Sequence, residues 1–216
     1  MGQRAMRTLK TLAALGAVLA AATSCGDVVR NGRAPVQLVI NSIQAAPGGG
    51  HGANQFVGFL LSDVLVLLTS PAPCTADNPC PTIYDDSGQA QLTIVPKDLG
   101  SGSTPIAPSQ SNAVTITRVH IKYTRADGRN VQGVDVPYEF DAAATATVNS
   151  ATTAVPIVFE LVRHAAKEEP PLMQLETSPS IINTIAEITF YGTDLVGNAV
   201  QATGTIQVNF GNFGDS

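Results

Sequence analysis

The stretch Val200-Gln-Ala-Thr-Gly-Thr-Ile-Gln-Val-Asn-Phe210 alternates between apolar or small residues and polar residues along its whole length. A period of two is typical of a β-strand with one face on a core and the other in water. Upstream, Ala186, Ile188 and Phe190 keep the same period and lead into the turn signal Asp194-Leu-Val-Gly-Asn198. The end of the chain therefore predicts two strands joined by a tight turn.

Similar runs continue toward the N-terminus and are separated by Gly, Pro, Asn and Asp. Alternating strands are predicted around Val36–Ile40, Ala90–Ile94, Ala142–Val148 and Ile157–Leu161. The run Phe56–Leu68 is almost continuously apolar. We interpret it as a doubly buried strand, although periodicity alone leaves a short helix as the alternative. The chain carries about nine predicted strands and no convincing helix.

The run Ala113–Arg125 changes its alternation midway. Val114 and Ile116 have one parity, whereas Val119, Ile121 and Tyr123 have the other. A shift of one residue turns every later side chain to the opposite face, so the strand needs a β-bulge to keep both groups in the core. The bulge is predicted at Thr117-Arg118, and Asp127-Gly128 then marks a turn.

Composition supports an all-β fold. Of 216 residues, 44% are hydrophobic and only 13% are charged, with 19 Gly and 14 Pro. The low charge disfavours helices built on Glu–Lys pairing, and short strands without intervening helices favour an antiparallel sandwich. The formal charge of −5 argues against a nucleic-acid-binding protein, which needs clustered Lys and Arg.

The N-terminus has the pattern of a secretory signal. Arg4, Arg7 and Lys10 precede the apolar run Leu12–Ala22, and Cys25 follows two small residues later. The apolar run is shorter than the roughly 20 residues that a membrane-spanning helix needs.

The segment Ala22-Thr23-Ser24-Cys25 resembles the lipobox of bacterial lipoproteins, although that family usually has Leu where this chain has Ala22. The resemblance implies cleavage before Cys25 and attachment of acyl chains to its thiol and its new amino group. By the same resemblance, Gly26 after the cysteine permits sorting to the outer membrane, whereas Asp at this position would favour retention at the inner one. The alternative is an ordinary signal peptide that leaves Cys25 unmodified. Several acyl chains would anchor the protein stably, whereas one myristoyl chain would be marginal.

These features divide the chain into a signal peptide (1–24), a lipid-anchored tether (25–34) and a β-sandwich domain (35–212). Cleavage would remove three basic residues and no acidic ones, so the mature charge becomes −8. We therefore expect a protein of the bacterial cell envelope, held at the outer membrane by its lipid on the periplasmic or the surface face, and not by a basic patch.

Cys74 and Cys80 remain as a pair once Cys25 is acylated. Outside the cytoplasm the default for such a pair is a disulfide, worth roughly 2 kcal/mol by the loop-entropy estimate. A metal site would need two more soft ligands nearby, and a redox motif would have two residues between the cysteines, not five. We predict a structural disulfide.

A second resemblance covers Val114–Phe210. Val119-His-Ile-Lys-Tyr123 with Asp127-Gly128 resembles the central strand and turn of fibronectin type III and immunoglobulin-like domains. Phe190-Tyr-Gly-Thr-Asp194 with Gly197-Asn198 resembles the last hairpin of bacterial immunoglobulin-like domains. The resemblance implies an immunoglobulin-like sandwich, but without the core Trp or the inter-sheet cysteine pair of that family. As a whole, the chain resembles uncharacterised bacterial envelope lipoproteins, which implies no activity.

No arrangement of polar residues predicts catalysis, a cofactor or a metal. The histidines, His51, His120 and His164, lack ligand spacing and are interpreted as surface or hydrogen-bonded residues. Calcium is a minor alternative for the acidic and amide residues, of which Asp127–Asn130 and Asp194–Asn198 read first as turns. These candidate residues are Asp85, Asp86, Asp127, Asn130, Asp135, Asp141 and Asp194.

Two functional hypotheses follow. The first is a non-catalytic, lipid-anchored structural or binding module that meets an envelope protein or a glycan through loops at one end of the sandwich. Its candidate loops are Gly48–Gly52, Cys74–Cys80 and Gly128–Gly133. The alternative is a secreted enzyme or carbohydrate-binding accessory protein with a site in the same loops, which carboxylates of raised pKa in a cleft would favour.

Overall fold

The computed structural model describes residues 32–49, 55–98, 100–101, 104–105, 108 and 110–214. The predicted signal peptide, the lipidation site Cys25, most of the predicted tether and His51 lie outside these residues. No helix in the described part of the chain is long and apolar enough to cross a bilayer.

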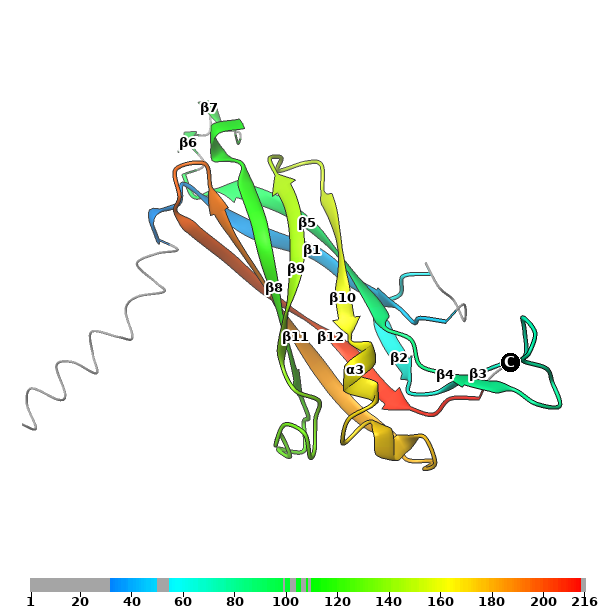
Figure 1. Ribbon diagram of the computed structural model, residues 1–216. Coiled ribbons are helices and arrows are strands. Elements are labelled where there is room, and N and C mark those ends of the chain that lie inside the picture. Colours follow the sequence, from blue (N-terminus) through cyan, green and yellow to red (C-terminus); the bar gives the residue numbers. More distant parts are fainter. Residues whose placement is uncertain are drawn as a thin grey trace, which may run out of the picture.

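Two β-sheets form the body, and their inner faces pack against each other (Figure 1). The smaller sheet has the strand order β1-β5-β10. Its members are β1 (Val36–Ala46), β5 (Asp86–Pro96) and β10 (Val155–Val162). The larger sheet has the order β2-β12-β11-β8-β9. Its members are β2 (Phe59–Asp63), β8 (Val114–Thr124), β9 (Phe140–Val148), β11 (Ile182–Asp194) and β12 (Ala199–Gly211).

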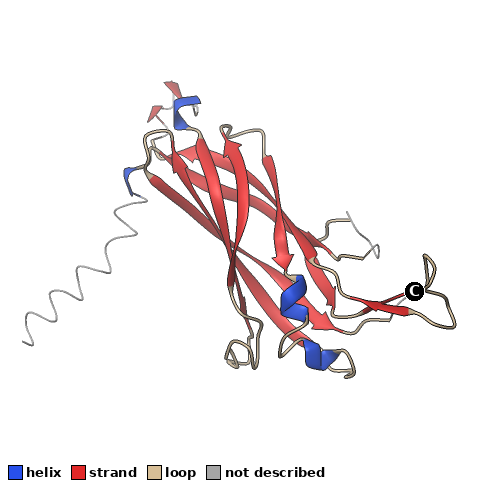
Figure 2. Cartoon of the chain, in the orientation of Figure 1, coloured by secondary structure: helices blue, strands red, loops and turns tan. Residues whose placement is uncertain are grey.

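The remaining elements are short and lie at the two ends of the body (Figure 2). Two small antiparallel pairs are formed by β3 (Val66–Leu68) with β4 (Cys80–Thr82) and by β6 (Gly100–Ser101) with β7 (Thr104–Pro105). The helical turns are η1 (Gln110–Asn112), α3 (His164–Lys167) and η2 (Met173–Leu175). The all-β prediction is therefore confirmed.

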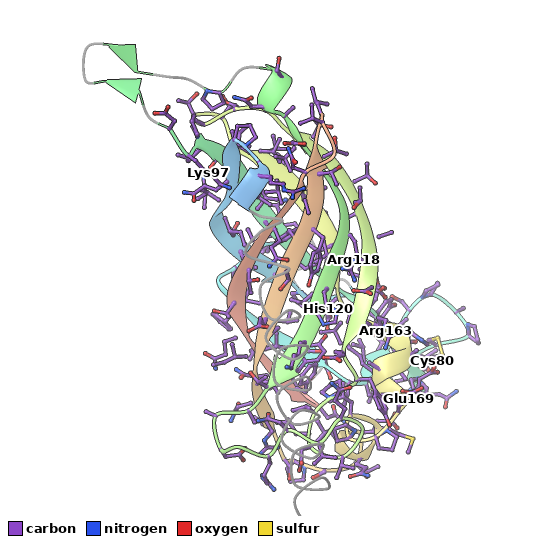
Figure 3. All side chains as sticks on the ribbon, turned by 90° about the vertical axis from the view of Figure 1, so that its left-hand side faces the viewer. Cys80, Lys97, Arg118, His120, Arg163 and Glu169 are labelled. Carbon is purple, nitrogen blue, oxygen red and sulfur yellow. A yellow bond between two sulfur atoms is a disulfide. The ribbon has the colours of Figure 1, made fainter. Side chains whose placement is uncertain are left out.

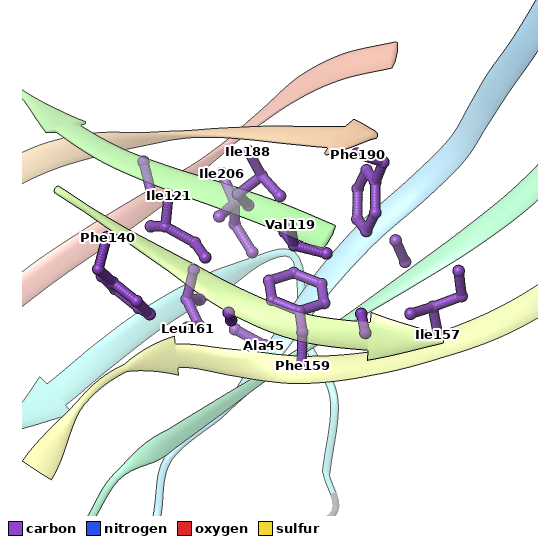
Figure 4. Close-up of a cluster of buried hydrophobic side chains, with 14 of the residues drawn as sticks. Ala45, Val119, Ile121, Phe140, Ile157, Phe159, Leu161, Ile188, Phe190 and Ile206 are labelled. Atoms are coloured by element: carbon purple, nitrogen blue, oxygen red, sulfur yellow. The ribbon is translucent and has the colours of Figure 1, made fainter. Parts of the chain in front are cut away.

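The core lies between the sheets because the alternating apolar residues of both sheets point inward (Figure 4). Phe159 of β10 meets Phe190 of β11 edge to face, with ring centroids 5.5 Å apart. The buried hydroxyl of Tyr123, on β8, donates a hydrogen bond to the carbonyl of Leu161, on β10. Within this core, the aromatic pair and the hydrogen bond each join the larger sheet to the smaller one.

The predicted bulge in β8 is confirmed. The pairing of β8 with β9 shifts between Ile116 and Arg118, and the residues of both parities are buried. Because the shift falls between the two parities, Ile116 and Val119 both reach the core.

Two expectations were wrong. The run Phe56–Leu68 is not one doubly buried strand: β2 ends at Asp63, whose carboxylate accepts hydrogen bonds from the backbone N–H groups of Leu65 and Phe213 and turns the chain. The sheets are also not purely antiparallel, because β2 pairs with β12 in parallel. Alternation of side chains is the same in both directions of pairing, so the sequence carries no signal for this difference.

Candidate functional site

The loops predicted to be functional gather at one end of the body. The β1–β2 connection, the β3–β4 arm and the β8–β9 loop all lie at the end opposite to the start of β1 (Figure 1). This end also holds α3, η2 and the last described residue, Gly214; we call it the distal end. Of the loop Gly48–Gly52, only Gly48 and Gly49 are among the described residues.

The predicted disulfide between Cys74 and Cys80 is confirmed, with a Cα–Cα distance of 5.3 Å. It closes the tip of the β3–β4 arm, which extends from the distal end (Figure 1). Within the described residues, β3 and β4 pair only with each other, so the disulfide holds an arm that has few other backbone ties.

A buried ion pair lies beneath the distal loops. The ammonium of Lys167, at the end of α3, is 2.9 Å from Oδ2 of Asp86, at the start of β5, and both side chains are 1% exposed. Ser62 donates a hydrogen bond of 2.6 Å to Asp86 Oδ2, and the backbone N–H of Gly48 donates one of 2.8 Å to Oδ1. Lys167 also donates to the carbonyl of Asp63 at 2.8 Å. The network joins the ends of β1, β2 and β10 to the start of β5.

Burial dominates the electrostatics of this network. It raises the pKa of Asp86 even though the Lys167 ammonium, Ser62 and Gly48 act in the opposite direction. Burial, and then the nearby Asp86 carboxylate, raises the pKa of Tyr123 as well. Asp86 thus has the raised pKa expected of a catalytic acid, but its side chain is enclosed and occupied by bonds within the protein, which is typical of a structural ion pair.

Arg163 follows β10 at the same end (Figure 3). Its guanidinium lies 4.4 Å from the centre of the Phe140 ring, a cation–π contact. Its Nε is the one buried side-chain nitrogen or oxygen of the described residues that lacks a hydrogen-bond partner. Sequence reasoning did not single out this residue, because nothing around it in the sequence differs from an ordinary strand end.

An apolar groove runs along β2, the edge strand of the larger sheet. Val57, Phe59 and Leu61 are between 42% and 48% exposed, while the alternate residues Leu60 and Ser62 are buried. Two neighbouring hollows of about 210 and 220 Å³ share Pro47 and Leu61. Their linings are Pro47, Gln55, Val57, Phe59 and Leu61 for the first and Pro47, Gly48, Leu61, Asp63, Val66, Phe213 and Gly214 for the second.

His120 belongs to a polar cluster on the outer face of the larger sheet, and its Nε2 lies 3.8 Å from Glu139 at the end of the β8–β9 loop (Figure 3). Its Nδ1 lies 2.9 Å from Asp141, which Arg118 also binds, and the Arg118 guanidinium stacks 4.0 Å from the Tyr191 ring centre. Hydrogen bonds from His120 and then Arg118 hold the pKa of Asp141 below its usual value. The cluster is solvent-exposed, which favours a surface ion network over a catalytic pair.

Three further acidic candidates form ion pairs or hydrogen bonds with groups in their own turns and loops. Asp127 binds Arg125 and Arg129 in the β8–β9 loop, and Asp135 accepts the backbone N–H of Val131. Asp194 accepts the backbone N–H groups of Val196 and Asn198. Among the described residues, no three His, Cys, Asp or Glu side chains gather where they could hold a metal ion.

No protein-family model matches the chain, and no curated protein matches it.

Proposed function

We propose that the chain is a non-catalytic, lipid-anchored protein of the bacterial cell envelope, a binding module that presents its distal end to a partner. The observation that carries this proposal is that the start of the described chain and the apolar groove lie at opposite ends of the body. The described body begins at Gly32, seven positions after the predicted lipidation site Cys25, and β1 starts at this end, whereas β2 and its apolar groove lie at the opposite end (Figure 1). A lipid anchor at the first end directs the groove away from the membrane.

The arrangement of strands supports an immunoglobulin-like fold for this module. In such domains the strands fall into two sheets, with the first, second, fourth and fifth in one and the third, sixth and seventh in the other. Here β1, β5 and β10 form one sheet, and β8, β11 and β12 are consecutive in the other. Among the described strands the smaller sheet has no counterpart of the fourth strand. We assign β9 as the additional strand at the edge of the second sheet, as in variable-type domains.

The partner is an extended segment of another envelope protein. β2 is the terminal strand of its sheet, and an edge strand can accept a further strand through its backbone. Its exposed apolar side chains, Phe59 and Leu61, supply a contact surface of the kind that marks protein interaction sites. A site for a small molecule or a glycan needs several convergent polar groups, and the two hollows have only the polar side chains of Gln55 and Asp63 in their linings.

Two measurements test the proposal. Growth with labelled palmitate should label the wild-type protein and leave the Cys25→Ala variant unlabelled. Pull-down from detergent-solubilised envelope should recover a partner protein that is lost on Phe59→Asp, because a carboxylate in an apolar groove must be desolvated on binding.

The control is Val131→Asp, which places the same charge on a valine of the β8–β9 loop that is 60% exposed, against 48% for Phe59. Retention of the partner by Phe59→Asp together with its loss on Val131→Asp would move the binding surface to that loop. An unlabelled wild-type protein would overturn the anchor.

A further inference from the structure

The turn between β11 and β12 carries two exposed apolar residues at its tip. Val196 is 80% exposed and Leu195 is 63% exposed, and Val196 is the most exposed large hydrophobic side chain in the described part of the chain. Hairpin tips are usually built from Gly, Asn, Asp and Ser, so two adjacent aliphatic residues at this position need an explanation.

This turn lies at the end of the body where the chain enters. The start of β1 lies beside the start of β12, since Val36, Leu38, Lys97 and Val200 line one shallow hollow (Figures 1 and 3). Gly32 lies seven positions after Cys25, and this stretch of chain spans at most about 25 Å when fully extended. A lipid on Cys25 therefore keeps this end of the body, and the β11–β12 tip with it, within a few tens of ångströms of the bilayer surface.

The tip is held by hydrogen bonds to Asp194 and carries no exposed charge of its own. The Asp194 carboxylate is 5% exposed and accepts the backbone N–H groups of Val196 and Asn198, at 3.0 and 2.8 Å, and the side-chain amide of Asn198 at 2.7 Å. From Tyr191 to Gln207 the sequence has no charged residue except Asp194. The tip can therefore enter a headgroup layer without desolvating an exposed charge and without first becoming ordered.

We propose that Leu195 and Val196 insert into the interface of the membrane that holds the lipid anchor. The tip and the acyl chains then form two contacts with one bilayer and fix the orientation of the body. This inference rests on the proposed anchoring at Cys25 and adds to it a second, protein-based membrane contact. Asp98 is exposed at the same end and limits insertion to the tip itself.

A fluorophore at the tip tests the proposal. The full chain carrying Val196→Cys is isolated from the envelope, labelled with an environment-sensitive dye and reconstituted in vesicles of phosphatidylcholine and phosphatidylglycerol. With Cys25 acylated and Cys74 bonded to Cys80, the introduced thiol is the only one that reacts. We expect a blue shift of the emission and loss of roughly half or more of the fluorescence to spin-labelled lipid. Leu195→Cys should give the same result.

The matched control is Val134→Cys, in the β8–β9 loop at the distal end, where the native valine is 66% exposed. Its emission should be neither shifted nor quenched. Absence of quenching at both tip positions in a palmitate-labelled protein overturns tip insertion and leaves the anchor intact. A blue shift that lipid does not quench assigns the tip to a protein contact and also overturns it. A second reactive thiol at Cys25 overturns the anchor and, with it, this inference.

Discussion

The buried ion pair of Asp86 and Lys167 connects segments that are distant in sequence. Removing one partner tests how much the pair contributes to the free energy of unfolding. Lys167→Met leaves a carboxylate buried with only Ser62 and Gly48 as partners, so we expect a loss of about 3–5 kcal/mol in the free energy of unfolding at neutral pH. Urea denaturation measures the loss. The exposed Lys122→Met is the control, and the double variant Asp86→Asn, Lys167→Met should recover much of the stability.

The same variant has a defined pH dependence. A folded-state pKa above the unfolded value means that the folded state keeps a proton which the unfolded state releases, so stability falls as pH rises above the ordinary carboxyl pKa of about 3.9. Burial already raises the pKa of Asp86, and loss of the Lys167 ammonium removes the main opposing influence. The destabilisation by Lys167→Met should therefore grow between about pH 4 and pH 7. A difference that stays constant over this range would contradict the assignment.

Gly88 shows how closely the two sheets pack. A Cβ at this position would lie 2.5 Å from the Phe159 ring, which is held in turn by Phe190. Gly88→Ala should therefore lower the stability by about 1–3 kcal/mol, measured by the midpoint of urea unfolding. Gly58→Ala, with no heavy atom within 4 Å of the added group, is the control. Addition of Phe159→Leu should restore part of the loss, and an equal effect of both alanines would refute the packing argument.

At the scale of elements, the strands with a clear period of two were predictable and the edge strand was not. The bulge in β8 could be predicted because two sets of core residues of opposite parity leave one place for the shift. The groove on β2 could not be predicted. The apolar run Phe59-Leu60-Leu61 is compatible with a strand buried on both faces and with a strand buried on one face. The Asp86–Lys167 pair joins residues 81 positions apart, and no local pattern signals such a contact.

The β3–β4 arm should respond to reduction as a separate unit. Because β3 and β4 pair only with each other in the described part of the chain, the entropy gained on opening Cys74–Cys80 is released within the arm. Reduction should speed hydrogen exchange at the amides of Val66–Leu68, Cys80 and Thr82 and leave the central strands β8 and β11 protected. Exchange measured with and without reductant reports this, and a matching loss of protection in β11 would show that the arm supports the whole fold.

At the scale of the whole molecule, the length of the strands sets how far the distal end stands from the membrane. The 13 residues of β11 run from one end of the body to the other and span about 40 Å. If the lipid lies at the entry end and the β11–β12 tip inserts, the body stands on the bilayer and the groove on β2 lies on the far side. This geometry would let a short tether present the groove without a long stalk.

The orientation can be measured by energy transfer to a dye in the lipid headgroup layer. A donor at Thr152→Cys, in the β9–β10 turn at the entry end, should transfer efficiently, whereas a donor at Met173→Cys, in η2 at the distal end, should transfer weakly. The contrast follows from the steep decline of transfer over the roughly 40 Å between the two ends. Replacing Leu195 and Val196 by serine should reduce the contrast without releasing the protein, because the acyl chains hold it but do not orient it. Equal transfer from both positions in the unaltered protein would mean that the body lies flat, which would bring the groove to the membrane and exclude the proposed presentation.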